Sequence, residues 1–302
     1  MISDKCNLCS NNIFSSYLNS DKMLRCDSCQ VIFLAPEQIP HDLNNYYQNN
    51  VFYAENASKP DLVRGMVRAA NFYLKIIAKQ IKNPAGKLLV DVGSNYGILM
   101  EEAERVGFQT IGLEKNNILV KKGRRRGLNI STDNLTELKT LRPIDIITAM
   151  HVLEHLPDPR SFIKDAYKKL AIGGILVIGV PNVESHLARK DGLSWRYMAI
   201  EHLFYFSEKT LRSLLEAEGF EIIEIRKDGS NLEEQGIKKL LRYLVGQPIL
   251  RDRFQVKSHE GRQPLLVSQT NWLKNIFKRL IIIIIKVLQR EDFILITSRK
   301  KD

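Results

Sequence analysis

Two acids and two glycines, set around two short apolar runs, form the part of this sequence best suited to binding a small molecule. The run that begins at Leu88 leads into Asp91, Gly93 and Gly97, and a second apolar run ends about twenty residues later in Glu114. A strand, a glycine turn, a helix and a second strand ending in an acid is how a parallel α/β sheet begins when it binds a nucleoside. The glycines let the backbone approach a ligand where a Cβ would collide, and Glu114 can accept hydrogen bonds from both ribose hydroxyls.

The glycine spacing argues against a dinucleotide. A dinucleotide fingerprint that began at Gly93 would need glycines at the positions that hold Asn95 and Ile98. The pattern D-x-G-x-x-x-G instead resembles motif I of the class I S-adenosylmethionine (SAM) methyltransferases. SAM carries no pyrophosphate, so its turn need not cradle one. Because an ordinary strand-turn-helix can hold the same glycines, the turn alone leaves both interpretations open.

Four later segments resemble the same family, in the branch that carries an HVLEHL-DP loop. They match that branch's fourth strand and following loop, its fifth strand, and its substrate-side loop with the next helix: Asp145–Pro159, Gly173–Asn182, Glu201–Ser207 and Leu211–Phe220. The resemblance implies a SAM-dependent methyltransferase. It also implies an α/β fold with a Rossmann-like, doubly wound, seven-stranded and mostly parallel sheet.

The resemblance carries over to the residues of a SAM pocket. The motif I turn, the ribose acid, the loop after the third strand and the end of the fourth strand correspond here to Asp91, Gly93, Ser94, Gly97, Glu114, Asp133, Asn134, Met150 and His151. Ser94, Asn95 and Tyr96 replace the Cys, Thr or Gly residues often found in this turn. The hydrogen bonds of the turn are therefore left open by the resemblance.

Three histidines, His151, His155 and His202, are candidates for the base that removes the acceptor's proton, because a neutral imidazole titrates near neutral pH. The loop that begins Glu201-His202 resembles the Glu-His loop of bacterial sugar C-methyltransferases, in which the histidine is the base. The resemblance thus implies His202 as base, with Glu201 orienting it. Purely structural roles for His202 and His155 stay open, as do O-, C- and N-methylation.

All four cysteines of the chain lie near its start, in the pattern C-x₂-C-x₁₆-C-x₂-C: Cys6, Cys9, Cys26 and Cys29. This spacing falls within the range of four-thiolate zinc sites, and each C-x₂-C can present two sulfurs to one metal. Two disulfides would be the poorer explanation in a cytosolic chain. We expect a closed, structural zinc site, similar to the zinc module with which the sugar C-methyltransferases begin.

The chain divides into five predicted segments: a zinc-binding, zinc-ribbon-like module (1–40), a linker and lead-in helix (41–85), a SAM-binding core (86–227), a helical insertion (228–291), and a final strand with a basic tail (292–302). Apolar patterning predicts strands near 87–92, 109–113, 128–131, 144–149, 174–180, 220–226 and 293–298. It predicts helices near 61–82, 97–106, 115–126, 161–170 and 208–218. Such alternation is typical of a doubly wound parallel sheet.

Charge is concentrated in the last quarter of the chain. Residues 228–302 hold 15 Lys/Arg and 8 Asp/Glu, which places +7 of the formal net charge of +11 there. Within this part, residues 272–288 have the periodicity of an amphipathic helix with a basic polar side. We interpret it as a cover over the core, a homodimer contact or an element lying on anionic lipid. With no signal peptide and no apolar run of about 18 residues, we expect a cytoplasmic protein, in peripheral contact with a membrane if the lipid interpretation holds.

Our leading hypothesis is a methyltransferase that acts on a hydroxyl, or an acidic carbon, of a sugar, nucleotide-sugar or glycan precursor. A zinc-bearing RNA methyltransferase is a second hypothesis. Base N-methyltransferases usually carry an Asn/Asp-Pro-Pro-aromatic motif after the fourth strand, whereas this chain has Met150–His155, so we do not expect a nucleic-acid partner. The third hypothesis, a non-catalytic binding protein on the same fold, is disfavoured by the intact Asp91, Gly93, Gly97 and Glu114.

Overall fold

The computed structural model describes residues 5–39, 42, 59–199, 201–227 and 292–301. Its larger sheet has seven strands in the order β10-β11-β8-β7-β4-β5-β6. These are β4 (Leu88–Val92), β5 (Gln109–Leu113), β6 (Ile130–Ser131), β7 (Ile144–Met150), β8 (Leu170–Pro181), β10 (Phe220–Lys227) and β11 (Phe293–Lys300). The pairs from β6 to β8 are parallel, while β11 runs antiparallel to both of its neighbours. The predicted α/β fold with a mostly parallel seven-stranded sheet is confirmed.

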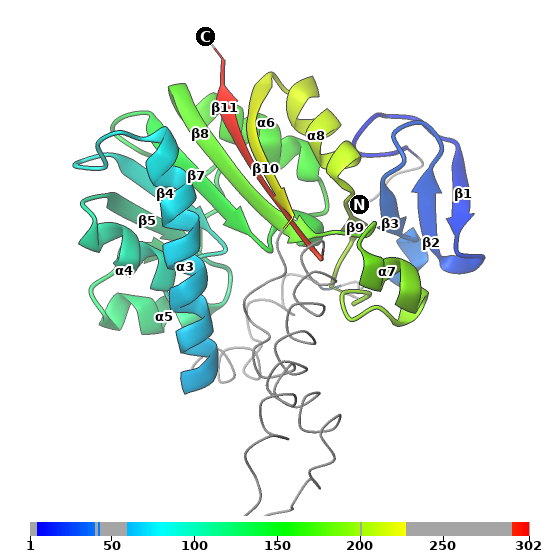
Figure 1. Ribbon diagram of the computed structural model, residues 1–302, viewed down its shortest axis with the longest axis horizontal. Coiled ribbons are helices and arrows are strands. Elements are labelled where there is room, and N and C mark those ends of the chain that lie inside the picture. The colour runs from blue at the N-terminus through cyan, green and yellow to red at the C-terminus, as the bar shows by residue number, and fades with distance from the viewer. Residues whose placement is uncertain (1–4, 40–41, 43–58, 200, 228–291, 302) are drawn as a thin grey trace, which may run out of the picture.

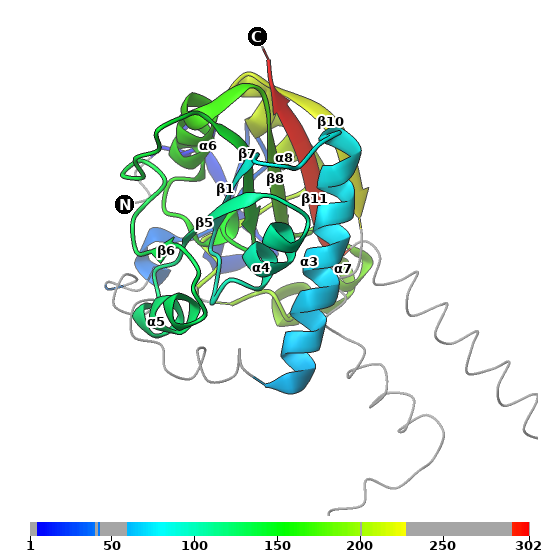
Figure 2. The ribbon, with the colours of Figure 1, turned by 90° about the vertical axis from the view of Figure 1, so that its left-hand side faces the viewer.

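Helices cover both faces of this sheet. One face carries α3 (Pro60–Gln80), α4 (Ile98–Arg105) and α5 (Asn117–Arg125), and the other carries α6 (Pro159–Lys169) and α8 (Glu208–Ala217) (Figures 1 and 2). Successive strand residues point to opposite faces, so Leu89 packs under α3 and α4 while Val90 packs under α6 and α8. Because both faces are buried, the central strands read as continuous apolar runs.

The N-terminal module shares a sheet with the rest of the chain. Strands β1 (Phe14–Tyr17), β2 (Ser20–Cys26) and β3 (Ile32–Leu34) form an antiparallel meander, and β3 pairs antiparallel with β9 (Phe204–Tyr205). Next to that pair, the Leu34 N–H donates to the Leu203 carbonyl at 2.9 Å. The module therefore lies beside α7 and α8, as Figure 1 shows, and holds the segment that follows Glu201.

The elements differ from the predicted ones mainly at their ends. Strand β8 is longer than predicted because its first residue, Leu170, still pairs with Ile144. Strand β6 keeps only two of four predicted residues. Helix α7 (His186–Asp191) and strand β9 were not predicted, because each is too short to show a periodicity. The linker at 43–58 and the insertion at 228–291, including the amphipathic stretch 272–288, lie outside the described residues.

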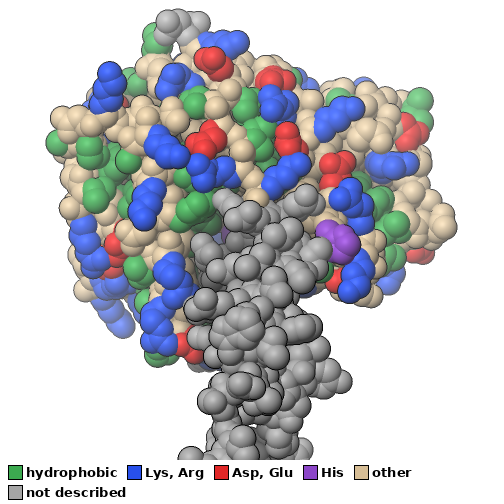
Figure 3. All heavy atoms as spheres, in the orientation of Figure 1, with side chains coloured by type: hydrophobic (Ala, Val, Ile, Leu, Met, Phe, Trp, Pro, Cys, Tyr) green, Lys and Arg blue, Asp and Glu red, His purple; other side chains and the backbone are tan. Residues whose placement is uncertain are grey.

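The described surface shows no large patch of a single charge sign in the view of Figure 3. Lys and Arg side chains lie among Asp and Glu side chains over the described part of that face. Within the described residues, no helix is both long and apolar enough to cross a membrane.

Candidate active site

The glycine turn between β4 and α4 is built for close approach of its backbone. Gly93 has φ +72°, and a Cβ on it would lie 2.5 Å from Val152 Cγ2. Gly97 has φ +92°, and its Cβ would lie 2.2 Å from Leu128 Cδ1. Both conformations are costly for residues with a Cβ. The turn after β4 thus packs directly against the loop after β7, which contains His151 and His155.

Asp91, the fourth of the five residues of β4, has a buried carboxyl group. Thr148 Oγ1, on the neighbouring strand β7, donates to Asp91 Oδ1 at 2.7 Å. Burial raises the pKa of Asp91 to about 7, the Thr148 hydrogen bond opposes this, and the charge on Glu114 adds to it. A carboxyl that is retained at such a cost at the ligand edge of a sheet is a mark of a functional site.

Glu114 stands at the end of β5 with its carboxylate held by backbone. The N–H groups of Asn95 and Asn116 donate to its two oxygens at 2.9 and 2.8 Å. Burial raises the pKa of Glu114, and these backbone hydrogen bonds pull it back in part. Each carboxylate oxygen has a second lone pair, so two hydroxyls of a ribose can still donate to it.

The remaining residues of the predicted pocket lie along the same edge. Ser94 is buried, and no described residue gives its Oγ a hydrogen-bond partner. Asp133 and Asn134 are exposed just beyond β6, whose Ser131 pairs with Leu113 beside Glu114. Met150 ends β7. An unpaired buried hydroxyl, a turn that a Cβ would fill and a backbone-held acid fit the methionine and ribose parts of SAM.

A cluster of three histidines and one carboxylate occupies the loop after β7 and the segment before β9. Glu154 is 1% exposed, and His151 Nδ1 lies 3.3 Å from its Oε1. The rings of His155 and His202 are in edge contact, with centroids 4.6 Å apart. Burial alone would raise the pKa of Glu154, but the contact with His151 and the neighbouring histidines outweigh it, and the net pKa is lowered. Glu154 is therefore ionised near neutral pH.

His202 is buried and neutral at pH 7, because burial lowers its pKa. The charge of Glu201, the partner predicted for His202, opposes this lowering, and the Glu201 carbonyl accepts a hydrogen bond from His155 Nδ1 at 2.9 Å. The carboxylate inside the cluster is Glu154, whose carbonyl also accepts from the Leu203 N–H at 2.8 Å. The loop after β7 and the segment before β9 are thus joined by two hydrogen bonds.

Glu154 and Tyr197 belong to this cluster and were not predicted as site residues. Glu154 follows His151 by three positions and precedes His155, and that spacing was visible in the sequence. The ring of Tyr197 is stacked with those of both His151 and His202, with centroids 6.3 and 6.2 Å away. It comes from the irregular segment after α7, where no periodicity marks a position.

The four cysteines converge as predicted. Cys6 and Cys29 sulfurs lie 3.6 Å apart, Cys9 and Cys26 sulfurs 3.5 Å apart, and all four within 4.8 Å of one another. Tetrahedral zinc with bonds of about 2.3 Å needs sulfurs roughly 3.8 Å apart. The contact with Cys29 lowers the pKa of Cys6 to about 5, which stabilises a first thiolate. The geometry is compatible with one zinc ion.

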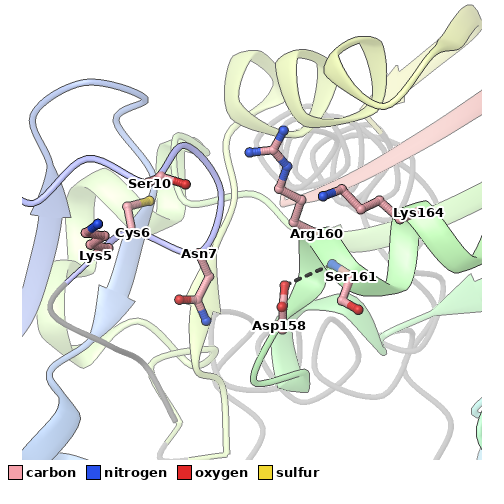
Figure 4. Close-up of a pocket in the computed structure, with 8 residues that line it drawn as sticks. All are labelled: Lys5, Cys6, Asn7, Ser10, Asp158, Arg160, Ser161 and Lys164. Atoms are coloured by element: carbon pink, nitrogen blue, oxygen red, sulfur yellow. Dashed lines mark hydrogen bonds between the residues drawn. The ribbon is translucent and has the colours of Figure 1, made fainter.

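A pocket of about 350 Å³ lies between this module and α6 (Figure 4). Its lining includes Lys5, Asn7, Arg160 and Lys164. Arg160 is already engaged, because its Nε donates to Glu218 at 2.5 Å and its Nη1 to the Leu8 carbonyl at 3.1 Å. The pocket contains none of the predicted SAM-binding or catalytic residues, and Arg160 joins the module to the core through these two contacts.

Comparison with known proteins agrees with this geometry. The family model described as "Methyltransferase domain" matches residues 66–225, more than half of the chain. The chain belongs to this methyltransferase domain family.

Individual relatives are more distant. A ubiquinone biosynthesis O-methyltransferase of Psychrobacter cryohalolentis is 33% identical over 113 residues, which cover 32% of this chain and 42% of that protein. The protein of the same name in Vibrio cholerae is 30% identical over 125 residues, covering 38% and 51%. The chain thus spans about half or less of the length of the curated relatives it matches. Phosphoethanolamine N-methyltransferase 2 of Haemonchus contortus, solved with SAM, has a TM-score of 0.50 at 13% identity over 77% of this chain and 53% of that one, a likeness of fold alone.

Proposed function

We propose that this chain catalyses SAM-dependent methyl transfer to a hydroxyl, or an acidic carbon, of a sugar, nucleotide-sugar or related glycan precursor. One observation carries the proposal: Asp91 and Glu114 stand at the ends of adjacent strands, and the histidine cluster follows the strand on the other side of Asp91. Relatives named O-methyltransferases favour a hydroxyl. The sugar class rests on the resemblance of the Glu201–Ser207 loop.

We propose that the donor site acts by holding SAM and orienting its methyl group toward the acceptor. When bound, SAM supplies a methyl group on a sulfonium, which already has a good leaving group. Glu114 would accept the ribose hydroxyls, Ser94 Oγ would gain a partner, and the backbone at Gly93 would pass close to the ligand. Asp91 would bring a negative charge near the ligand's positive groups, which also favours its ionised form. The protein's own contribution is then mainly position.

We propose that a histidine of this cluster takes the proton from the acceptor. His202 remains our first choice of base, because it is neutral near pH 7 and a neutral imidazole can take a proton. The nearby Glu154 carboxylate would stabilise the imidazolium that forms. Glu201, which we predicted as the orienting residue, would act through its carbonyl on His155.

The N-terminal module is proposed to bind one structural zinc ion and to brace the acceptor side. Its β3 pairs with β9, which begins two residues after His202. A closed four-thiolate site has no open position for chemistry. The metal would therefore act by keeping the segment around β9 ordered.

Mass spectrometry of reactions with SAM tests the proposal. The panel should hold nucleotide-sugars, glycans, a simple catechol and RNA, with the His202→Ala variant as control. We expect a gain of one methyl on a member of the sugar set, and none with the variant. Methylation of the catechol alone would overturn the sugar class, and methylation of RNA alone would overturn the small-molecule acceptor.

A further inference from the structure

Glu154, His155 and His202 offer three metal-binding atoms to one small space. One ligand atom of each lies within 4.8 Å of the other two. Glu154 comes from the loop after β7, and His202 from the segment that the N-terminal module holds, so the cluster is fixed from two sides. It is separate from the cysteine cluster, which is formed by the N-terminal module alone.

Neighbouring carbonyl groups determine which histidine nitrogens carry protons. His155 Nδ1 must donate to the Glu201 carbonyl, so in the neutral ring Nε2 carries the lone pair. The ring of His202 donates to the Tyr197 carbonyl, and no described residue partners its Nδ1, so Nε2 is the donor and Nδ1 carries the lone pair. Histidines that bind metals almost always donate their other ring N–H to a carbonyl or carboxylate in this way.

Glu154 completes the set with an acceptor-only group. Among the described residues, neither of its carboxylate oxygens receives a hydrogen bond, although the side chain is almost wholly buried. Its Oε1 lies 3.3 Å from His151 Nδ1, which is a charged partner only when that histidine is protonated. Burying a carboxylate beside the unpartnered Nδ1 of His202 is unfavourable unless a positive group satisfies both.

We infer that Glu154, His155 and His202 bind a divalent cation. Two imidazoles and one carboxylate suit Zn²⁺, Co²⁺ or Mn²⁺ better than Mg²⁺, which prefers oxygen ligands. Three protein ligands leave positions open on the ion.

The consequence for catalysis, unlike the cation site itself, rests on the proposed function. A hydroxyl that binds such an ion loses its proton more easily, so the site would favour a hydroxyl over a carbon as acceptor. A lone pair bound to a metal cannot take a proton, so with the ion bound His202 would be a ligand and not the base proposed above. His151, which contacts Glu154 and has 30% of its side chain exposed, would then take the role of base.

Cobalt titration of the full-length, zinc-loaded protein tests the site. Co²⁺ on histidine and carboxylate gives weak visible bands, whereas Co²⁺ that displaces zinc from thiolates gives intense charge-transfer absorption, so the spectrum tells the two sites apart. We expect about one Co²⁺ per chain with the weak bands, and binding at least about tenfold weaker in Glu154→Gln and in His155→Asn. The exposed Glu184→Gln and His186→Asn provide matched controls that keep wild-type binding.

The outcomes separate the two proposals. If the wild-type protein gives only thiolate bands or no cobalt binding, the cation site is wrong. Equal affinity in wild type and both cluster variants would also overturn it, since the ion would then lie elsewhere. Calorimetry with SAM on the same samples reads the proposed function independently, because the SAM site uses none of these three side chains. Should one variant fail to fold, the wild-type titration and the other variant still decide.

Discussion

The Asp91→Asn substitution should stabilise the protein at neutral pH while weakening its ligand site. Asp91 is buried, and burial raises its pKa from 3.8 to about 7. Between these two values the unfolded chain releases this proton and the folded chain retains it, so stability falls as pH rises. At about 1.4 kcal/mol per pKa unit, the penalty above pH 7 reaches about 4 kcal/mol. Asparagine has the same shape, can accept from Thr148 and escapes this penalty.

Urea unfolding at several pH values measures this effect. We expect wild type and Asp91→Asn to be similar near pH 4 and to diverge as pH rises, with the variant more stable by up to about 4 kcal/mol at pH 8. Asp21→Asn, at an exposed position of β2, is the matched control and should track wild type. A variant that is equally or less stable than wild type at pH 8 would refute the reasoning that this carboxyl is retained at the expense of stability.

Three further changes test other parts of the molecule. Cys26→Ser should lose about one zinc per chain and lower turnover with it, because β3 positions β9; full metal content by elemental analysis would contradict this. His202→Ala should lower turnover about 10²–10⁴-fold with SAM affinity intact, and unchanged turnover would remove it from the proton-transfer step. Gly97→Ala should cost about 1–2 kcal/mol for its left-handed backbone plus the clash with Leu128. Gly86→Ala has a similar φ but open space, so in thermal melts it should cost the backbone part alone; an equal loss in both would refute the clash.

The parts of the fold that repeat a regular pattern could be predicted from the sequence. The central strands are continuous apolar runs, and the glycines after Val92 mark the turn. The order of strands and helices could therefore be predicted. Strand β9 has two residues, and pairs with β3 across more than 160 positions of sequence. No local pattern encodes such a contact, so the attachment of the N-terminal module to the segment after Glu201 was not predicted.

The site shows the same division. Motif positions such as Asp91 and Glu114 were predictable because a fixed spacing from a strand places them at the sheet edge. That Glu154 is the buried carboxylate among the histidines could not be predicted, because its direction depends on the backbone conformation of the loop after β7. His151 takes φ +55° there, and Glu154 turns inward rather than to solvent. Glu201, next to His202 in sequence, contacts His155 through its carbonyl, and its charge raises the pKa of His202.

Calorimetric titration with SAM tests the central claim most directly, because every proposed step depends on the donor site at the ends of β4 and β5. We expect one SAM per chain, and a loss of roughly 1.5–3 kcal/mol in Glu114→Ala, the scale for removing hydrogen bonds to a charged group. Asp91→Ala should show a similar loss, while Glu184→Ala, at an exposed position, should leave affinity unchanged. No binding by the folded wild-type protein, or wild-type affinity in both site variants, would contradict the account.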